Sequence, residues 1–376
     1  MENNIFFATT PRGVEPVLAD ELQQMEITVT AIEKGGVRFS GDMATCYKAN
    51  LWLRTANRIL QPLAEFFCET PQHLYDGVRT IDWRRFLTPE MTIAVDCKVR
   101  DSGITHSGYA ALKTKDAIVD CIRDHCGRRP SVDTLDPDLR INIHILRNNC
   151  TVSLDTSGVS LDKRGYRLDT GEAPLRETLA AALLELSGWD GTVPLVDPMC
   201  GAGTIAIEAA LKATRRPPGL IRNQFGFQRW PDFDSTLWRK IVDAAEGQIL
   251  EAPPAPILGY DISARAIENA RKNGRRAGVE NMLAFAKSNI SDLTPPGPPG
   301  IIVFNPPYGA RLDEEESLKP LYKKIGDVLK QRCKGYTAYL FTGNSELSKC
   351  IGLKATRRVV LFNGPIECRL LKYELY

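Results

Sequence analysis

The segment Ile301–Tyr308 constrains the chain most strongly, because four apolar residues run directly into Asn-Pro-Pro-Tyr. Ile-Ile-Val-Phe is typical of a strand that is buried on both faces, as in a parallel sheet. Pro306 and Pro307 end this strand, since neither has an N–H for the ladder, and they favour an extended backbone at Asn305. We therefore expect the Asn305 amide at the carboxyl end of a buried strand, where open α/β sheets bind ligands. A plain strand followed by a proline-rich turn is the alternative.

A second segment of this kind begins at Asp197, where an expected strand over 193–196 leads into Asp-Pro-Met-Cys-Gly-Ala-Gly-Thr and a helix over 205–213. Gly201 and Gly203 allow a ligand to approach the backbone closely. The turn has an acid at the strand end and lacks the third glycine of a dinucleotide-binding turn. It therefore favours a ligand with a cation or hydroxyls over a pyrophosphate. S-adenosylmethionine has this chemistry, because its ammonium group needs an acceptor.

Asp261 ends the next expected strand, over 257–260, and such a carboxylate usually binds ribose hydroxyls. A turn or helix-capping role is the alternative. Asp261 stands 64 positions after Asp197, so we predict an insertion over about 213–255 on the ligand-binding edge. Its arginines, Arg222 and Arg229 among them, alternate with aromatic residues, which suits unstacked RNA bases and their phosphates. The alternative is a surface excursion whose aromatic residues form a satellite core.

The first half of the chain has a different pattern. Residues 1–60 show a strand–helix–strand–strand–helix order, with the second helix expected over 43–59, that resembles half of a ferredoxin-like domain. Residues 61–167 form a second α+β unit that has a helix expected over 73–86 and ends in two strands. This unit carries basic residues that could neutralise phosphates, although acidic neighbours make a solvated helix face the alternative. The candidates for RNA binding are Lys113, Lys115, Arg128 and Arg164, together with Arg222 and Arg229 of the insertion.

Length and composition agree with this division. The 376 residues favour two or three domains, and the net charge of +2 does not by itself indicate nucleic acid. The chain has no uncharged apolar run of membrane-spanning length and no signal-peptide pattern at its start. Its ten cysteines form no Cys-x-x-Cys pair, so we expect neither a metal site nor disulfides, and a cytoplasmic location.

Several motifs then indicate a family. APLRETLAAALL, DPMCGAGT, GYDIS and NPPYGARLD resemble the S-adenosylmethionine-dependent methyltransferases that modify exocyclic amines. The upstream half resembles a THUMP RNA-binding domain preceded by a ferredoxin-like segment. LWLRTANRI, KTKDAIVD, LDKRGYR and NGPIEC extend the likeness over essentially the whole chain. Together they are similar to the THUMP-containing bacterial methyltransferases of large-subunit ribosomal RNA, above all the N-terminal guanine-N2 module of the RlmL type.

The resemblance implies a ferredoxin-like segment over 1–60, a THUMP domain over 61–167 and a Rossmann-like methyltransferase domain over 168–376, an α/β fold with a mostly parallel sheet and an antiparallel last hairpin. The residues it implies in catalysis are Asn305, Pro306, Pro307 and Tyr308. Those it implies in binding S-adenosylmethionine are Asp197, Pro198, Cys200, Gly201, Gly203, Thr204, Asp261, Ile262, Asn289 and Asn305. Many relatives have aspartate at position 289, so Asp292 is the alternative there. A nucleophilic role for Cys200 is disfavoured, because carbon-5 methyltransferases place their thiol elsewhere.

The expected reaction is methylation of the guanosine N2 amine in 23S ribosomal RNA, with Asn305 and the Pro306 carbonyl accepting the amine hydrogens and Tyr308 stacking on the base. The partner would be this RNA or a ribosome-assembly particle. Methylation of tRNA guanine-N2 or of adenine-N6 is one alternative, since both bases present an exocyclic amine. A non-catalytic RNA-binding assembly factor is another. The sequence leaves open the modified nucleotide and the oligomeric state.

Overall fold

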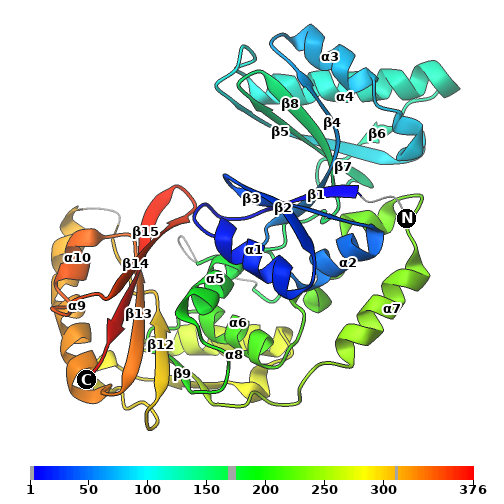
Figure 1. The fold of residues 1–376 in the computed structure, drawn as a ribbon. Coiled ribbons are helices and arrows are strands. Elements are labelled where there is room, and N and C mark those ends of the chain that lie inside the picture. Colours follow the sequence, from blue (N-terminus) through cyan, green and yellow to red (C-terminus); the bar gives the residue numbers. More distant parts are fainter. Residues whose placement is uncertain (1–3, 168–174, 310–311) are drawn as a thin grey trace.

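The computed structural model describes residues 4–167, 175–309 and 312–376 and contains two large sheets, one in each half of the chain. The predicted start of the methyltransferase domain at residue 168 lies outside the described residues. Figure 1 shows the two halves joined through β1–β3, α1 and α2, with the unit that carries α3 and α4 projecting from them. The fold is mixed α/β, as the sequence predicts.

The N-terminal half is built on an eight-stranded sheet with the order β2-β3-β1-β4-β8-β7-β5-β6. Its strands are β1 (Asn4–Thr9), β2 (Thr28–Glu33), β3 (Gly36–Gly41), β4 (Arg58–Phe67), β5 (Thr92–Arg100), β6 (Ser131–Val132), β7 (Leu139–Leu146) and β8 (Asn149–Asp155). Its helices are α1 (Glu15–Gln24), α2 (Met43–Trp52), α3 (Pro71–Arg79) and α4 (Ser107–Cys126), with a 3₁₀ turn η1 (Trp83–Arg85). The long strand β4 pairs with β1 and with β8, so the units predicted over 1–60 and 61–167 share one sheet.

Two predicted helices of this half are too long. The helix expected over 43–59 ends at Trp52, and the carboxylate of Glu21 accepts the N–H groups of Arg54 and Thr55 just beyond it, at 2.5 Å and 3.1 Å. These bonds satisfy backbone groups that would otherwise continue the helix. The helix expected over 73–86 ends at Arg79 and is followed by η1.

The C-terminal half contains a seven-stranded sheet with the order β11-β10-β9-β12-β13-β15-β14. Its strands are β9 (Leu195–Asp197), β10 (Ile257–Asp261), β11 (Ala284–Lys287), β12 (Gly300–Phe304), β13 (Tyr336–Thr342), β14 (Arg357–Asn363) and β15 (Ile366–Glu374). The first five are parallel and the last two form an antiparallel hairpin, as predicted. Its helices are α5 (Glu177–Ser187), α6 (Thr204–Ala213), α7 (Ser235–Glu246), α8 (Ala264–Arg276), α9 (Leu312–Arg332) and α10 (Ser345–Lys349), with 3₁₀ turns η2 (Pro218–Ile221), η3 (Gly226–Arg229), η4 (Glu280–Met282) and η5 (Ile290–Asp292).

Apolar side chains cover both faces of this sheet. Leu195 and Val303 point into a cluster with α5, α6 and α8, whereas Val196 and Ile302 point into a cluster with α9. Successive strand residues thus alternate between two buried layers, which explains why the parallel strands read as continuous apolar runs. The carboxyl ends of these strands are left as the open edge where a ligand can bind.

The insertion over 213–255 packs against the N-terminal half. Phe225, Phe227 and Trp230 are buried in the same cluster as the core of β1–β8, and the Phe227 ring stacks on Tyr47 of α2 at 4.4 Å. In Figure 1, α7 lies beside α2, on the opposite side of the molecule from β14 and β15. The prediction that this insertion forms the substrate side of the pocket is therefore wrong for its aromatic residues, and the satellite-core alternative describes them.

Within the ranges described above, no helix has the length and apolarity needed to cross a bilayer. The same residues contain no group of three or more His, Cys, Asp or Glu side chains placed to hold a metal ion. All ten cysteines are free thiols.

Candidate active site

Three predicted site residues lie at the ends of three adjacent strands. β9 lies between β10 and β12, with Asp197 paired to Gly259 and Val196 paired to Ile302. All three strands run in the same direction, so Asp197, Asp261 and the residue after Phe304 reach one edge of the sheet. The structure therefore brings together two segments that are more than a hundred positions apart in the sequence.

The carboxylate of Asp261 connects two of these strand ends. Its Oδ2 accepts the N–H of Gly201 at 3.0 Å, and its Oδ1 accepts the N–H of Ser263 at 2.8 Å. The Cys200 N–H also donates to the carbonyl of Tyr260 at 2.8 Å. The glycine turn after β9 is thus held directly against the end of β10.

The two glycines of this turn serve different purposes. Both have positive φ, +52° at Gly201 and +83° at Gly203, which favours glycine. A Cβ on Gly203 would lie 2.9 Å from Ala270 of α8, so this position is needed for close packing. A Cβ on Gly201 would meet no atom within 4 Å, so this position faces open space. The turn therefore packs on one side and leaves room for a ligand on the other.

Asp197 is almost fully buried, with 1% of its surface exposed. Burial, with a smaller contribution from the nearby Asp261 carboxylate, raises the pKa of its carboxyl to about 8, although the N–H of Met199 acts to lower it. Without a cation beside it, Asp197 therefore favours the protonated form near neutral pH. A ligand cation beside this carboxyl would favour the ionised form, as the ammonium group of S-adenosylmethionine would do.

Asn305 follows β12 and holds an unused hydrogen-bond acceptor. Its Oδ1 is buried and accepts no hydrogen bond from any of the described residues. Pro306 is buried and Pro307 is exposed. The Tyr308 hydroxyl accepts a hydrogen bond from Asn363 Nδ2 at 3.2 Å, which ties this aromatic ring to the turn between β14 and β15. Because a buried polar atom normally has a partner, the Asn305 oxygen points to a donor that arrives with a ligand.

The remaining predicted cofactor residues surround the same edge. Ile262 is 65% exposed beside Asp261, and Asn289 caps η5 by accepting the N–H of Ser291 at 3.0 Å. Thr204 begins α6, and its hydroxyl accepts a hydrogen bond from Arg167. Pro198 and Cys200 are buried, and burial raises the pKa of the Cys200 thiol well above its usual range. A thiol of this kind is a poor nucleophile, and the absence of a nucleophilic role for Cys200 stays a prediction.

Comparison with protein families matches residues 164–372 to the RMKL-like methyltransferase domain, residues 5–60 to the RlmL ferredoxin-like domain and residues 68–155 to the THUMP domain. The chain is 43% identical to slr0064 of Synechocystis sp., described as an RNA methyltransferase, over 99% of this chain and 97% of that protein. This chain belongs to the family of THUMP-containing RNA methyltransferases.

Two further proteins to which the chain is similar are informative. The chain is 45% identical to the ribosomal RNA large subunit methyltransferase K/L of Methylococcus capsulatus over 98% of its own length, but it spans only 51% of that protein. The structure of SMU.472, described as a methyltransferase complexed with SAH, matches with a TM-score of 0.91 and 31% identity over 100% of this chain and 99% of that one. The chain thus spans about half the length of the K/L protein, and nearly all of SMU.472.

The predicted RNA-binding residues of this THUMP methyltransferase fall into two groups. Lys113, Lys115 and Arg128 belong to the THUMP unit and lie at its surface, where Arg128 pairs with Glu90 at 2.6 Å and Lys115 with Asp116 at 2.5 Å. Lys113 lies 4.5 Å from the centre of the Tyr75 ring. Their contact with RNA stays a prediction.

Arg164 belongs to the second group, because it is buried between the N-terminal half and the methyltransferase domain. Its side chain is 2% exposed and pairs with Glu208 of α6 at 3.4 Å. It also donates to the carbonyls of Leu161 and Arg54. The prediction that Arg164 binds RNA is therefore wrong, since a guanidinium enclosed in this way is not available to a phosphate.

Arg222 and Arg229 of the insertion also bind other parts of the protein. Arg222 donates to four backbone carbonyls of the segment 157–163, and burial lowers its pKa to about 10. Arg229 pairs with Asp136 at 2.7 Å and donates to the Asp136 and Pro137 carbonyls. Both arginines hold the insertion against the THUMP half, which contradicts the prediction that they bind RNA.

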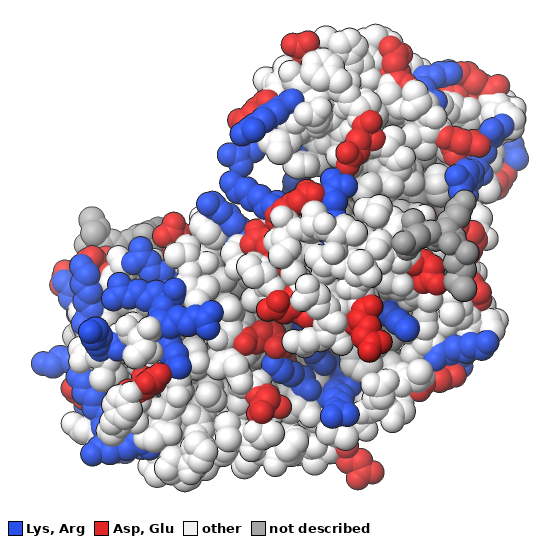
Figure 2. Space-filling view, viewed as in Figure 1, with Lys and Arg blue, Asp and Glu red and all other residues white. Residues whose placement is uncertain are grey.

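Sequence reasoning missed two features of the site. Arg167 contacts Thr204 and pairs with Glu177 at 3.5 Å, and burial raises the pKa of Glu177 to about 7. Both residues stand in motifs that carried the family resemblance, so the signal was present. The second feature is a gathering of Lys and Arg over β14 and β15, visible in Figure 2. The hairpin carries Arg357 and Lys372 on one face and Arg358 and Arg369 on the other. Arg369 and Lys372 pair with Glu367 and Glu374.

Proposed function

We propose that this protein transfers a methyl group from S-adenosylmethionine to the exocyclic N2 amine of a guanosine in large-subunit ribosomal RNA. The observation that supports this most strongly is the buried, unpartnered Oδ1 of Asn305 at the end of β12. An aromatic exocyclic amine carries two hydrogens, and a carbonyl oxygen at this place can accept one of them. The relatives named above as RNA and ribosomal RNA methyltransferases support the choice of substrate.

The residues at the strand ends fit the cofactor. Asp261 would bind the ribose hydroxyls, Asp197 would lie near the ammonium group, and the open side of Gly201 would admit the ligand close to the backbone. Ile262 and Asn289 would contact the adenine, with Asp292 as the alternative to Asn289. When bound, S-adenosylmethionine supplies an electrophilic methyl group on a sulfonium centre.

Asn305 and its neighbours would prepare the nucleophile. The amine lone pair is delocalised into the base, so the amine is a poor nucleophile until it becomes pyramidal. Asn305 Oδ1 and the Pro306 carbonyl would each accept one amine hydrogen, which aims the lone pair at the methyl group. Tyr308 would stack on the base and hold it outside its own stack. One amine proton leaves after transfer, and no covalent enzyme intermediate is needed.

The N-terminal half would recruit the RNA. The THUMP unit presents Lys113, Lys115 and Arg128 at its surface, and β14 and β15 add a basic surface to the methyltransferase domain. Contacts of this kind bind the phosphate backbone without reading its sequence. Discrimination among guanosines must then come from residues close to the catalytic pocket.

The test is transfer of a labelled methyl group to in vitro transcribed 23S rRNA and to a tRNA pool, followed by nucleoside analysis. The proposal expects N2-methylguanosine in 23S rRNA. If N2-methylguanosine is found only in tRNA, or N6-methyladenosine in either RNA, the substrate differs from the one proposed. The reaction would still be methyl transfer to an exocyclic amine. The absence of transfer to both free RNAs and to ribosomal particles, with cofactor bound, would favour the non-catalytic assembly factor.

A further inference from the structure

We propose that a pocket between the two halves of the chain binds a nucleotide near the target guanosine. This inference rests on the proposed function and adds to it a site for substrate selection. The pocket has a volume of about 350 Å³, which is within the range of small-ligand sites. Arg12 and Asn57 of the N-terminal half line it together with Arg176, Leu179, Phe362 and Gly364 of the methyltransferase domain.

One wall of the pocket is next in the chain to the residue that holds Tyr308. Asn363 lies in the chain between Phe362 and Gly364, and its Nδ2 is the donor to the Tyr308 hydroxyl at 3.2 Å. Neighbouring Cα atoms are about 3.8 Å apart, so the pocket wall is within one residue of the group that holds Tyr308. A nucleotide in the pocket would therefore lie close to a base stacked on Tyr308, within the same short segment of RNA.

The pocket presents a planar cation that can stack. The Arg12 guanidinium lies over the Phe362 ring, 4.4 Å from its centre. Within the described residues Arg12 forms no ion pair, and its side chain is exposed. Unstacked RNA bases stack on arginine planes and on aromatic rings, and arginine also binds phosphate. The Arg12–Phe362 pair thus has the chemistry of a nucleotide platform.

The loop that carries Arg12 is fixed in place. The carboxylate of Glu15 accepts the N–H of Gly13 at 2.6 Å and the N–H of Gly35 at 2.8 Å. Gly13 lies directly against β14, where a Cβ would be only 2.6 Å from the carbonyl oxygen of Val360. Figure 1 shows this end of the N-terminal half beside the turn between β14 and β15. The platform is therefore preorganised by both halves.

A second arginine completes the site. Arg176 precedes α5 and is 52% exposed, with Asp162 at 3.5 Å as its partner. The opposite wall is held by Asn57, whose Oδ1 accepts the Thr178 hydroxyl at 2.9 Å. Two arginines around one pocket suit a ligand that carries a phosphate and a stacking surface. A nucleotide of a single-stranded or opened RNA has both.

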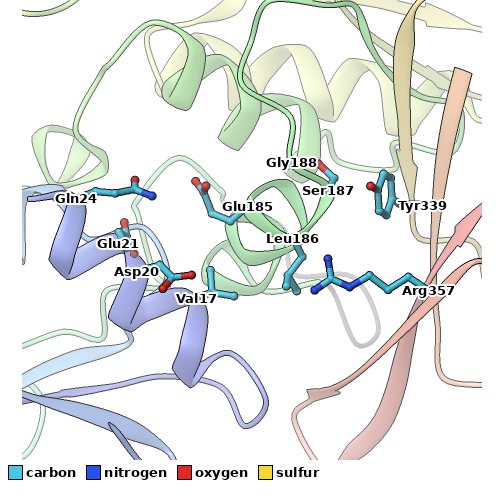
Figure 3. A pocket seen from close by; sticks show the side chains of 10 residues that line it. All are labelled: Val17, Asp20, Glu21, Gln24, Glu185, Leu186, Ser187, Gly188, Tyr339 and Arg357. Carbon is cyan, nitrogen blue, oxygen red and sulfur yellow. The ribbon is translucent and has the colours of Figure 1, made fainter. Parts of the chain in front are cut away.

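A larger cavity between the two halves differs from this pocket in the charge of its lining residues. It has a volume of about 430 Å³ and is lined by Asp20, Glu21 and Glu185, with Arg357 at its far side (Figure 3). Carboxylates repel a phosphate backbone, so of these two interdomain pockets only the one with Arg12 suits RNA.

The experiment measures RNA binding and methyl transfer separately. The probe is a fluorescein-labelled single-stranded RNA hexamer with one guanosine among uridines, with S-adenosylhomocysteine at saturation, and its binding is followed by anisotropy. Arg12→Ala should raise the dissociation constant about tenfold and reduce the salt slope by about 0.7, since one phosphate contact is lost. Phe362→Leu should weaken binding with little change in the salt slope. Both variants should keep the wild-type cofactor affinity and melting temperature.

Arg332→Ala is the matched control, because Arg332 is an exposed arginine at the end of α9, outside the pocket. The pocket proposal is overturned if Arg12→Ala and Phe362→Leu bind the hexamer as Arg332→Ala does, or if the wild type does not bind it. Failure of the proposed function looks different: the wild type transfers no methyl group to 23S rRNA or tRNA. Weakened hexamer binding in the Arg12 variant would support the pocket in that case as well.

Discussion

Asp261 Oδ2 accepts the N–H of Gly201 at 3.0 Å, and so a single carboxylate fixes the glycine turn after β9 to the end of β10. The same carboxylate accepts the N–H of Ser263 with its other oxygen. Asp261 therefore has the turn role that the sequence offered as an alternative, and its binding of ribose hydroxyls stays a prediction. Its removal should affect both the shape of the turn and the hydroxyl-binding group.

Asp261→Ala should weaken binding of S-adenosylmethionine by about 1.5–3 kcal/mol, the worth of a hydrogen bond to a charged group. Calorimetry should thus show a dissociation constant roughly ten to a hundred times higher. Ser263→Ala is the control, because it removes the bond from Ala266 N–H to the Ser263 hydroxyl and leaves the Asp261 carboxylate in place. Equal cofactor affinities in the two variants would mean that Asp261 only shapes the turn.

Asn305→Ala should reduce methyl transfer by at least about a hundredfold, because it removes a preorganised group that acts on the developing charge. Cofactor affinity should change little, since Asp197, Asp261 and the glycine turn are untouched. The measurement is kcat with labelled cofactor at saturating RNA, together with the cofactor dissociation constant. Turnover near the wild-type value would rule out the amine-activating role of Asn305.

The elements at the catalytic edge could be predicted because their signals are local. The apolar run before Asn305 and the strand–turn–helix around Gly201 each contain the information that fixes their conformation. Their meeting at one edge follows from parallel strand order, which alternating strands and helices predict. The identity of the domains is predicted by the family resemblance, because the local patterns alone do not distinguish one α/β family from another.

The roles of the arginines could not be predicted, because they depend on contacts between distant segments. Arg164 and Glu208 are separated by 44 positions, and Arg222 reaches carbonyls about 60 positions away. In a sequence, an arginine that binds buried carbonyls looks the same as one that binds phosphate, because both tasks use the same planar donors. The docking of the insertion on the N-terminal core decides between them.

Asp197→Asn should change how stability depends on pH. The folded-state pKa of about 8 lies above the ordinary value of 3.8, so between these values the folded protein binds more protons than the unfolded chain. The Asp197 contribution to the free energy of unfolding therefore falls as pH rises through this window. The variant should melt at a higher temperature than the wild type near the upper end of the window, in the absence of cofactor.

The same carboxyl gives a second readout of this prediction. A cationic ligand group would favour ionised Asp197, so cofactor binding below about pH 8 should release a proton in the wild type and not in Asp197→Asn. Calorimetry in buffers of different ionisation enthalpy measures this release. Identical proton release in both proteins would show that Asp197 does not titrate on binding.

Arg222→Ala combined with Arg229→Ala should lower the melting temperature and leave RNA affinity unchanged. Arg222 donates to the carbonyls of Ser157, Val159, Ser160 and Lys163, which would lose their partners. Bonds to a charged donor contribute roughly 1.5–3 kcal/mol each when one side is left unsatisfied, so the melting temperature should fall by several degrees. Arg239→Ala is the control, because Arg239 is exposed on α7 of the same insertion. Weaker RNA binding by the double variant at an unchanged melting temperature would mean that the insertion forms part of the substrate side of the site.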